Sequence, residues 1–243
     1  MLDDECVDDL QINGLKIFQK TDGFKFGIDA VLLSDFAKDS PSKRTVDLCT
    51  GTGIIPLLLS AKTKTPYICG VEIQKDIADM AKRSVIYNKL GKRVEIIEAD
   101  LKTFPQKYGK GSFDKVVCNP PYMKALTAVI NQADTKTISR HEVMCTLDDV
   151  IKAAADLLLP KGRLFMVHRP QRLADVLCSM RKFHIEPKRL RMVAPSPSKA
   201  PNLMLVEGMY FGGEELRMLP ELYIYNEDGS YSEEIDRIYG RII

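Results

Sequence analysis

The sequence predicts an α/β fold in which helices cover both faces of a central, mostly parallel sheet that ends in an antiparallel C-terminal edge. Between residues 45 and 118, short apolar segments of strand length alternate with segments of helical spacing, which is typical of a parallel sheet with crossover helices. Further along, three strand-like segments follow one another without a helix between them. Such consecutive strands favour antiparallel pairing.

The first 44 residues are interpreted as an extension of a single domain (residues 1–243) whose core is residues 45–243. Residues 14–26 alternate apolar and polar side chains around Thr21-Asp22-Gly23, a turn signal that predicts a hairpin. Residues 28–38 have helical spacing, with Asp29 in the first turn, where an acid suits the helix dipole.

The core elements are predicted from periodicity and from turn residues. Apolar runs bounded by turn signals predict strands, and longer segments with apolar side chains three and four residues apart predict helices. Residues 123–145 are polar and mixed, and a loop of that length beside a site is often functional. The predicted strands are residues 45–48, 67–71, 94–97, 113–118, 163–168, 189–193, 203–211 and 219–225, and the predicted helices are residues 53–62, 75–90, 147–159 and 171–183.

Composition and cysteine usage exclude several classes of protein. With 243 residues, 45% hydrophobic and 28% charged, the chain can bury a full core. Its six cysteines form no C-x-x-C pair, so we expect neither a metal site nor a disulfide framework. The acidic start lacks the basic region of a signal peptide, and the longest apolar stretch is too short to span a bilayer. We therefore expect a cytoplasmic protein with no membrane contact.

Basic residues are unevenly distributed along the chain. Residues 161–199 hold ten basic residues against two acids, although the net charge of the whole chain is +2. Such asymmetry indicates a polyanionic partner. A solvated surface explains it equally well, because residues clustered in sequence need not cluster in space.

The strongest functional signal is Asn119-Pro120-Pro121-Tyr122, which directly follows the predicted strand of residues 113–118. Open α/β sheets bind ligands at the carboxyl ends of their strands, so this tetrapeptide would place an amide, an unpaired carbonyl and a flat ring at a binding edge. These groups suit a planar amino group and the ring that carries it. The alternative is a tight turn, since Pro-Pro alone marks loops.

A second signal, DLCTGTG at residues 47–53, joins a predicted strand to a predicted helix. Its glycines let the backbone approach a ligand, and amide groups at the helix start point at that ligand. Glu72 ends the next strand, where an acid can accept hydrogen bonds from both ribose hydroxyls of an adenosine-type cofactor. Asp100 ends the third strand, where it could meet the adenine amino group or only cap a turn.

The loop fits S-adenosylmethionine better than a dinucleotide. The pattern G-x-G-x-x-G would require glycine at Pro56. S-adenosylmethionine has no pyrophosphate, and Asp47 is placed to face its ammonium. Residues 26–30, which include Asp29, could form a wall over the cofactor or could simply begin a helix.

The two signals together predict methyl transfer to an amino group. The lone pair of an aromatic amine is delocalised into its ring. If the Asn119 oxygen and the Pro120 carbonyl each accept one amine hydrogen, the nitrogen becomes tetrahedral and can attack the sulfonium methyl in line. Tyr122 would stack on the base, worth roughly 1–3 kcal/mol, and the base must be unpaired or extruded to enter.

Longer motifs carry a family resemblance over nearly the whole chain. They are FGIDAVLLSDFA, DLCTGTG, GVEIQ, EAD, CNPPY, LLLPKGRLFMVHRPQRL, PKRLRMV and NLMLVEG. In these the chain resembles the bacterial tRNA adenine-N(6)-methyltransferases that act on the adenosine 3′ of the anticodon, position 37, of valine tRNA. The resemblance implies a Rossmann-like class I methyltransferase fold with a seven-stranded sheet, S-adenosylmethionine as cofactor and tRNA as partner.

The resemblance also implies roles for single residues. Asn119, Pro120, Pro121 and Tyr122 would be catalytic, and Cys49 stands where the usual DxGxGxG loop has its first glycine. The residues that would approach RNA phosphate are Lys188, Arg189, Arg191 and Lys199. The candidate cofactor-binding residues are Asp29, Asp47, Cys49, Gly51, Gly53, Glu72, Ile73, Asp100, Leu101 and Asn119.

Three other functions remain open at this point. A protein glutamine N(5)-methyltransferase uses the same Asn-Pro-Pro-Tyr, but such proteins usually carry a long helical domain before the glycine loop, and only 46 residues precede Asp47 here. A ribosomal RNA guanine-N(2)-methyltransferase fits the motif as well. A non-catalytic RNA-binding protein with a relict cofactor fold is the third. The oligomeric state is open, with a monomer as the simpler expectation.

Overall fold

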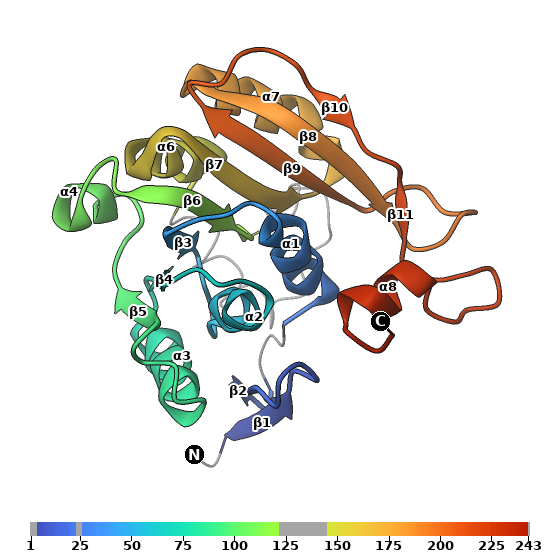
Figure 1. Cartoon of the computed structure of the whole chain (residues 1–243), viewed down its shortest axis with the longest axis horizontal. Coiled ribbons are helices and arrows are strands. Elements are labelled where there is room, and N and C mark those ends of the chain that lie inside the picture. Colours follow the sequence, from blue (N-terminus) through green and yellow to red (C-terminus); the bar gives the residue numbers. More distant parts are fainter. Residues whose placement is uncertain (1–3, 23–25, 122–144, 243) are drawn as a thin grey trace, which may run out of the picture.

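The computed structural model describes residues 4–22, 26–121 and 145–242, and within these residues a nine-stranded sheet lies between two layers of helices (Figure 1). The predicted α/β class is therefore confirmed. The strands of this sheet are β3 (Arg44–Leu48), β4 (Tyr67–Glu72), β5 (Val94–Glu98), β6 (Phe113–Cys118), β7 (Leu158–His168), β8 (Ile185–Ala194), β9 (Leu203–Tyr210), β10 (Arg217–Met218) and β11 (Leu222–Tyr223).

The sheet is parallel except for one strand. Its order is β10-β8-β9-β7-β6-β3-β4-β5, and β11 also pairs with β8. Strand β9 is antiparallel to both β7 and β8, so it lies inside the sheet rather than at its edge. The two-residue strands β10 and β11 run parallel to β8. Without them, the sheet has the seven strands that the resemblance implies.

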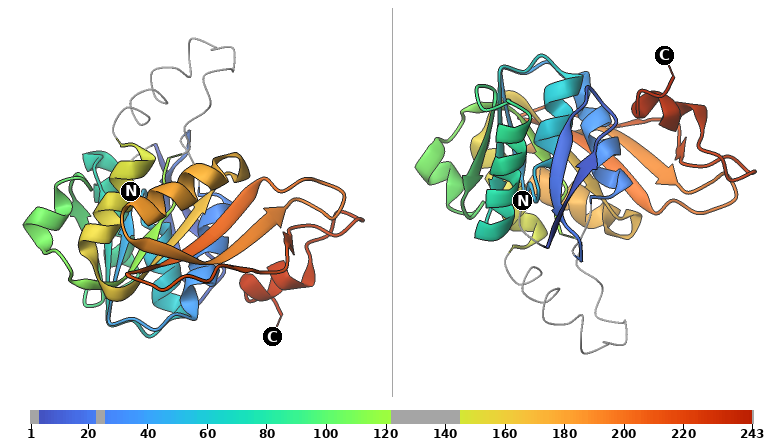
Figure 2. Two further views of the ribbon diagram at one scale, coloured as in Figure 1. Left: turned by 90° about the horizontal axis from the view of Figure 1, so that it is seen from above. Right: turned by 90° about the horizontal axis from the view of Figure 1, so that it is seen from below.

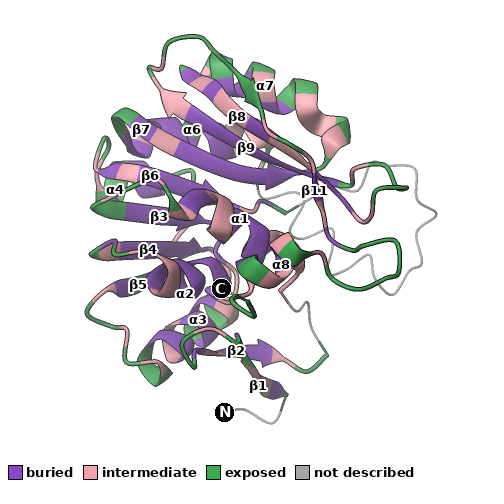
Figure 3. Ribbon diagram, turned by 45° about the vertical axis from the view of Figure 1, so that its right-hand side comes forward, coloured by how far each residue is buried: buried purple, intermediate pink, exposed green. Residues whose placement is uncertain are grey.

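Two apolar clusters fill the space between the sheet and its helices, as the buried middle layer of Figure 3 shows. One cluster joins the sheet to α1, α2, α3 and α8, and the other joins it to α4, α6 and α7. The helices are α1 (Ile28–Lys38), α2 (Ile54–Lys62), α3 (Lys75–Tyr87), α4 (Phe104–Tyr108), α6 (Leu147–Leu157), α7 (Leu173–Lys182) and α8 (Glu233–Ile238), with a 3₁₀ turn, η1 (Pro170–Arg172), before α7.

The N-terminal hairpin lies earlier in the chain than predicted. It pairs β1 (Glu5–Asp9) with β2 (Lys16–Lys20), so the predicted hairpin around Thr21-Asp22-Gly23 was wrong; Thr21 and Asp22 form a turn after β2, and Gly23 lies outside the described residues. The real turn contains Asn13-Gly14, with φ of 49° and 67°. Asn-Gly tolerates this left-handed conformation better than other pairs do, which explains why the chain reverses there.

Helix α3 anchors the hairpin to the core, and the view from below in Figure 2 shows the two side by side. The Arg83 guanidinium forms a two-point ion pair with the buried Glu5 carboxylate. The Phe18 backbone N–H donates to Ser84 Oγ at 3.0 Å. These contacts hold the hairpin beside the start of α2.

Pro160-Lys161-Gly162 does not separate a helix from a strand as predicted. Helix α6 ends at Leu157, and β7 begins at the next residue and runs through the proline. The pairing of β6 with β7 shifts register at this point, and Lys161 has φ 67°. A bulge can hold a proline inside a strand because it leaves a residue unpaired.

The carboxyl ends of β3, β4, β5, β6 and β7 meet at one edge of the sheet because these strands are parallel. This edge carries both sequence signals. In the described part of the chain, no helix is long and apolar enough to cross a membrane.

Candidate active site

The loop after β3 has the backbone that its glycines predict. Gly51 and Gly53 have φ of 57° and 84°, and Cys49 also lies in the left-handed region, at φ 60°. A non-glycine residue there costs about 1 kcal/mol, which explains why glycine is the usual residue at this position. The Cys49 side chain packs against the apolar cluster that contains Cys118. The backbone at Cys49 therefore has the conformation that glycine would adopt at this position.

Asp47 is buried beneath this loop. Its Oδ2 accepts a hydrogen bond from Thr50 Oγ1 at 2.6 Å, while its Oδ1 has no partner among the described residues. Burial raises the pKa of Asp47 from 3.8 to about 8, the Thr50 hydrogen bond opposes the rise, and the Glu72 charge adds to it. An acceptor without a partner is what a ligand ammonium requires, so the residues present fit the methionine end of S-adenosylmethionine.

Glu72 ties the loop to the end of β4. One of its carboxylate oxygens accepts the Gly51 N–H at 2.9 Å, and the other accepts the Gln74 N–H at 2.9 Å. The Gln74 side chain also donates to Oε1 at 3.3 Å, and a carboxylate has about four acceptor positions, so Oε2 is the oxygen that can still accept a ribose hydroxyl. Glu72 therefore shapes the glycine loop as well as the predicted ribose site.

Asp100 lies after β5, and its Oδ1 accepts the Lys102 N–H at 2.8 Å while its carbonyl begins the turn into α4. The turn-capping alternative is thus realised in the structure. Contact with adenine stays a prediction for Asp100, and cofactor binding stays a prediction for the half-buried Ile73 and the buried Leu101.

Asn119 stands next to the cofactor loop. The pair Leu48–Cys118 closes the register of β3 and β6, so Cys49 and Asn119 leave adjacent strand ends. The Asn119 Nδ2 donates to Asp29 Oδ2 at 3.1 Å. The structure thus brings Asp29, predicted as a cofactor wall, against the predicted catalytic amide. Pro120 and Pro121 follow, and Tyr122 lies outside the described residues.

His168 was not singled out from the sequence, but it ends β7 at the same edge of the sheet as the candidate site. It lies two positions beyond Met166, the register partner of Cys118. Its Nδ1 accepts the Arg169 N–H at 2.8 Å. Burial, followed by the charge of Arg172, lowers the pKa of His168 to about 4, so the imidazole is neutral at physiological pH. Its position at the end of a predicted strand was the available signal.

Most of the predicted RNA-contacting cations have partners within the protein. Arg189 forms an ion pair with the buried Glu207, and Arg191 binds both carboxylate oxygens of Glu234 at 2.6 and 2.8 Å. The Lys188 ammonium donates to the carbonyls of residues 213 and 214. Lys199 differs: it is exposed in the loop between β8 and β9, with no ion-pair partner in the described part of the chain. Contact with RNA stays a prediction for all four.

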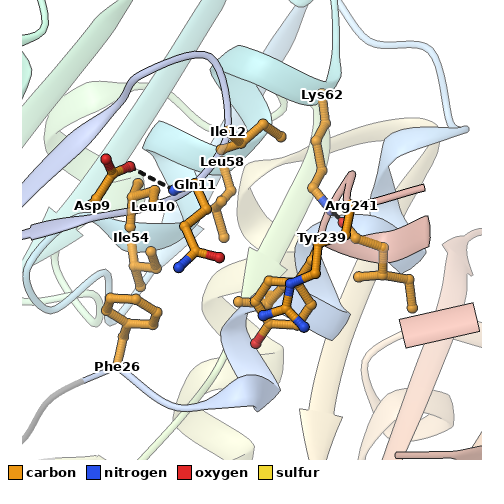
Figure 4. Close-up of a pocket in the computed structure, with 12 residues that line it drawn as sticks. Asp9, Leu10, Gln11, Ile12, Phe26, Ile54, Leu58, Lys62, Tyr239 and Arg241 are labelled. Carbon is orange, nitrogen blue, oxygen red and sulfur yellow. Dashed lines mark hydrogen bonds between the residues drawn. The ribbon is translucent and has the colours of Figure 1, made fainter. Parts of the chain in front are cut away.

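A cavity of about 140 Å³ lies between the hairpin turn, α1, α2 and the C-terminal residues (Figure 4). Its wall includes Phe26, Ile54, Leu58 and Tyr239 but none of Asp47, Glu72 or Asn119. It is therefore not the predicted cofactor site. All six cysteines are free thiols, and no group of three or more potential metal ligands occurs within the described ranges.

Comparison with known proteins identifies the family. Residues 26–183 match the family described as methyltransferase small domain. Two relatives carry the name tRNA1(Val) (adenine(37)-N6)-methyltransferase. The one from Porphyromonas gingivalis is 29% identical over 189 residues, which cover 75% of this chain and 73% of that protein. The one from Bacteroides thetaiotaomicron is 29% identical over 213 residues, which cover 87% and 81%.

Solved structures show the same fold. A predicted O-methyltransferase from Agrobacterium tumefaciens superimposes with a TM-score of 0.72 at 20% identity, over 87% of this chain and 95% of that one. A Pyrococcus horikoshii protein in complex with MeSAdo gives 0.59 at 14% identity, over 87% and 73%. The predicted class I methyltransferase fold is thus confirmed. The chain belongs to the methyltransferase small domain family and is an S-adenosylmethionine-dependent methyltransferase.

Proposed function

We propose that the chain transfers a methyl group from S-adenosylmethionine to the 6-amino group of an adenine in tRNA, at position 37 of a valine tRNA, in the cytoplasm. The observation that carries this proposal is the adjacency of Asn119 and the glycine loop, fixed by the pairing of Leu48 with Cys118. It sets an amide beside the predicted position of the methyl donor. The relatives named for adenine(37) favour this substrate over guanine or glutamine.

The reaction needs positioning rather than a strong base. Asn119 Oδ1 and the Pro120 carbonyl would each accept one hydrogen of the target amine, so that its lone pair points at the methyl group. The N–C bond forms as the S–C bond breaks, and the nitrogen then loses one proton to solvent. The acceptors stabilise the positive charge that develops on that nitrogen.

The test is nucleoside mass spectrometry after incubation with isotopically labelled S-adenosylmethionine. Unmodified tRNA, ribosomal RNA and a release factor would be offered separately. Label in N(6)-methyladenosine from tRNA is the expected result. Label in N(2)-methylguanosine or in glutamine would replace the substrate, and no label in any of them would favour the relict, non-catalytic alternative.

We expect cofactor binding to release about one proton near pH 7, because an ammonium facing Asp47 favours its ionised form. In the ligand-free protein, folded Asp47 keeps its proton up to its raised pKa of about 8, whereas the unfolded chain loses it near 3.8. Stability of the ligand-free protein should therefore fall as pH rises between these values.

Titration calorimetry in two buffers of different ionisation enthalpy measures the released proton. Asp47→Asn is the control, since it cannot ionise and should bind without releasing that proton. Binding to the native protein with no proton release would show that Asp47 keeps one protonation state throughout, which contradicts the expected ionisation on cofactor binding.

RNA binding should depend on Lys199 more than on Arg189 or Arg191, because the two arginines already neutralise buried or nearby carboxylates. Lys199→Ala is expected to reduce the slope of log K against log salt by roughly one. Arg191→Ala should instead loosen α8. A salt slope that is unchanged in Lys199→Ala would remove this residue from the interface.

A further inference from the structure

We infer that Asp29 is a positioning residue for Asn119: its carboxylate holds the amide with Nδ2 turned away from the target, so that Oδ1 faces the amine. This inference rests on the proposed function, because it concerns the orientation that amine methylation needs. The contact joins residues 90 positions apart, at 3.1 Å between Asn119 Nδ2 and Asp29 Oδ2.

The chemistry of the pair allows one orientation of the amide. An ionised carboxylate only accepts hydrogen bonds, whereas an amide has a donating end and an accepting end. Turning the Asn119 amide over would set its oxygen against the Asp29 carboxylate, and two acceptors repel each other. With Nδ2 donating to Asp29, Oδ1 is the end of the amide that can accept a hydrogen bond. An adenine amino group can donate that bond.

A hydrogen bond and the space beside Gly27 hold the Asp29 side chain in place. Its second oxygen, Oδ1, accepts the N–H of the following Ala30 at 2.9 Å. A Cβ added at Gly27 would lie 2.7 Å from this oxygen, so glycine leaves the space that the carboxylate occupies. Residues Ala30 to Ser34 of the same helix are buried, and they fix the start of α1 against the core.

A charge beside the amide also favours the reaction itself. The amine nitrogen becomes positive as it attacks the methyl group. A negative carboxylate behind the Asn119 amide makes Oδ1 a stronger acceptor, because hydrogen bonds in a chain polarise one another. The stabilisation then grows with the developing charge, which is what lowers a barrier.

The rival explanation is that Asp29 only supports the start of α1, where an acid suits the helix dipole. Asp29→Ser removes the contact with Asn119 and also the acid inside the first turn, after the N-cap Gly27, so kcat reports the first role and Tm the second. We expect Asp29→Ser and Asp29→Ala to lose about 10²-fold in kcat, with KM for RNA, cofactor affinity and Tm close to the native values. Asp35→Asn is the matched control on the same helix: it weakens ion pairs with Lys38 and Lys62 and should leave kcat unchanged.

Exchanging the two side chains gives the sharper test. Asn119→Asp alone places two carboxylates together and should be at least as impaired as Asp29→Ala. Combining it with Asp29→Asn restores one donor and one acceptor with their places reversed, and kcat should recover by about ten-fold.

Each outcome supports or overturns the inference. Activity of Asp29→Ser equal to native, or an exchanged pair no better than Asn119→Asp, would reduce Asp29 to a helix-start residue. These comparisons require that the native protein methylates adenine in tRNA. Failure of the native protein to label adenine would instead overturn the proposed function, before any variant is compared.

Discussion

Replacing Asn119 by alanine should lower kcat by about 10³-fold while S-adenosylmethionine still binds within a few-fold of its native affinity. The side chain supplies one of the two acceptors that would hold the target amine, and it leaves the sheet beside the cofactor loop without forming part of it. Single-turnover methylation of unmodified tRNA and a direct cofactor titration measure the two quantities separately.

A matched control is Asn226→Ala, which removes an exposed amide whose partners are Ser230 and Tyr231 in a surface turn. Its turnover should equal that of the native protein. If Asn119→Ala kept near-native turnover, the amine would be held by other groups, and the role given to Asn119 would be wrong.

The second large effect is expected for Glu72→Ala, which should weaken cofactor binding by about 100-fold. The change removes acceptors for the N–H groups of Gly51 and Gln74 as well as the predicted ribose contact, and each hydrogen bond to a charged group contributes about 1.5–3 kcal/mol. Because the glycine loop loses its tie to β4, the cofactor loses both a partner and a preformed site.

Glu98→Ala is the control for that experiment. Glu98 is the register partner of Glu72 on the neighbouring strand, but it is exposed, so its loss should leave the dissociation constant unchanged. Equal affinities in the native protein and in Glu72→Ala would contradict the ribose assignment.

Periodicity predicts the core strands well, since β3 to β6 lie within a residue of the expected ranges. The hairpin shows where this reasoning fails. The alternating pattern continues past Lys20, and it drew attention to Thr21-Asp22-Gly23 although Asn13-Gly14 is the stronger hairpin signal. Hydrogen bonds to Ser84 of α3 and to its C-cap Asn88 hold β2 in the pairing that uses Asn13-Gly14, and such contacts are not visible in local sequence. Short helices such as α4 and α8 carry too few turns to show a period.

Strand ends predict the candidate site, because a parallel sheet gathers them at one edge. Asp47, Glu72 and Asn119 were placed in this way. The pairing of Asp29 with Asn119 was out of reach, since it depends on how α1 packs across β7 and α2. The ion pairs of Arg189 and Arg191 were missed for the same reason: charge counted along the sequence does not show which cations a carboxylate such as Glu207 already neutralises.

Strand β9 is synthesised after β8 yet lies between β7 and β8, so a growing chain cannot assemble this sheet in the order of translation. Until residues 203–210 have left the ribosome, β7 presents an open edge, and such an edge invites pairing with other chains. Strands β8 and β9 are close in sequence and can pair first, after which β9 docks onto β7. Nascent chains that stop before Leu203 should therefore be degraded by added protease, whereas chains extended past Tyr210 should resist it.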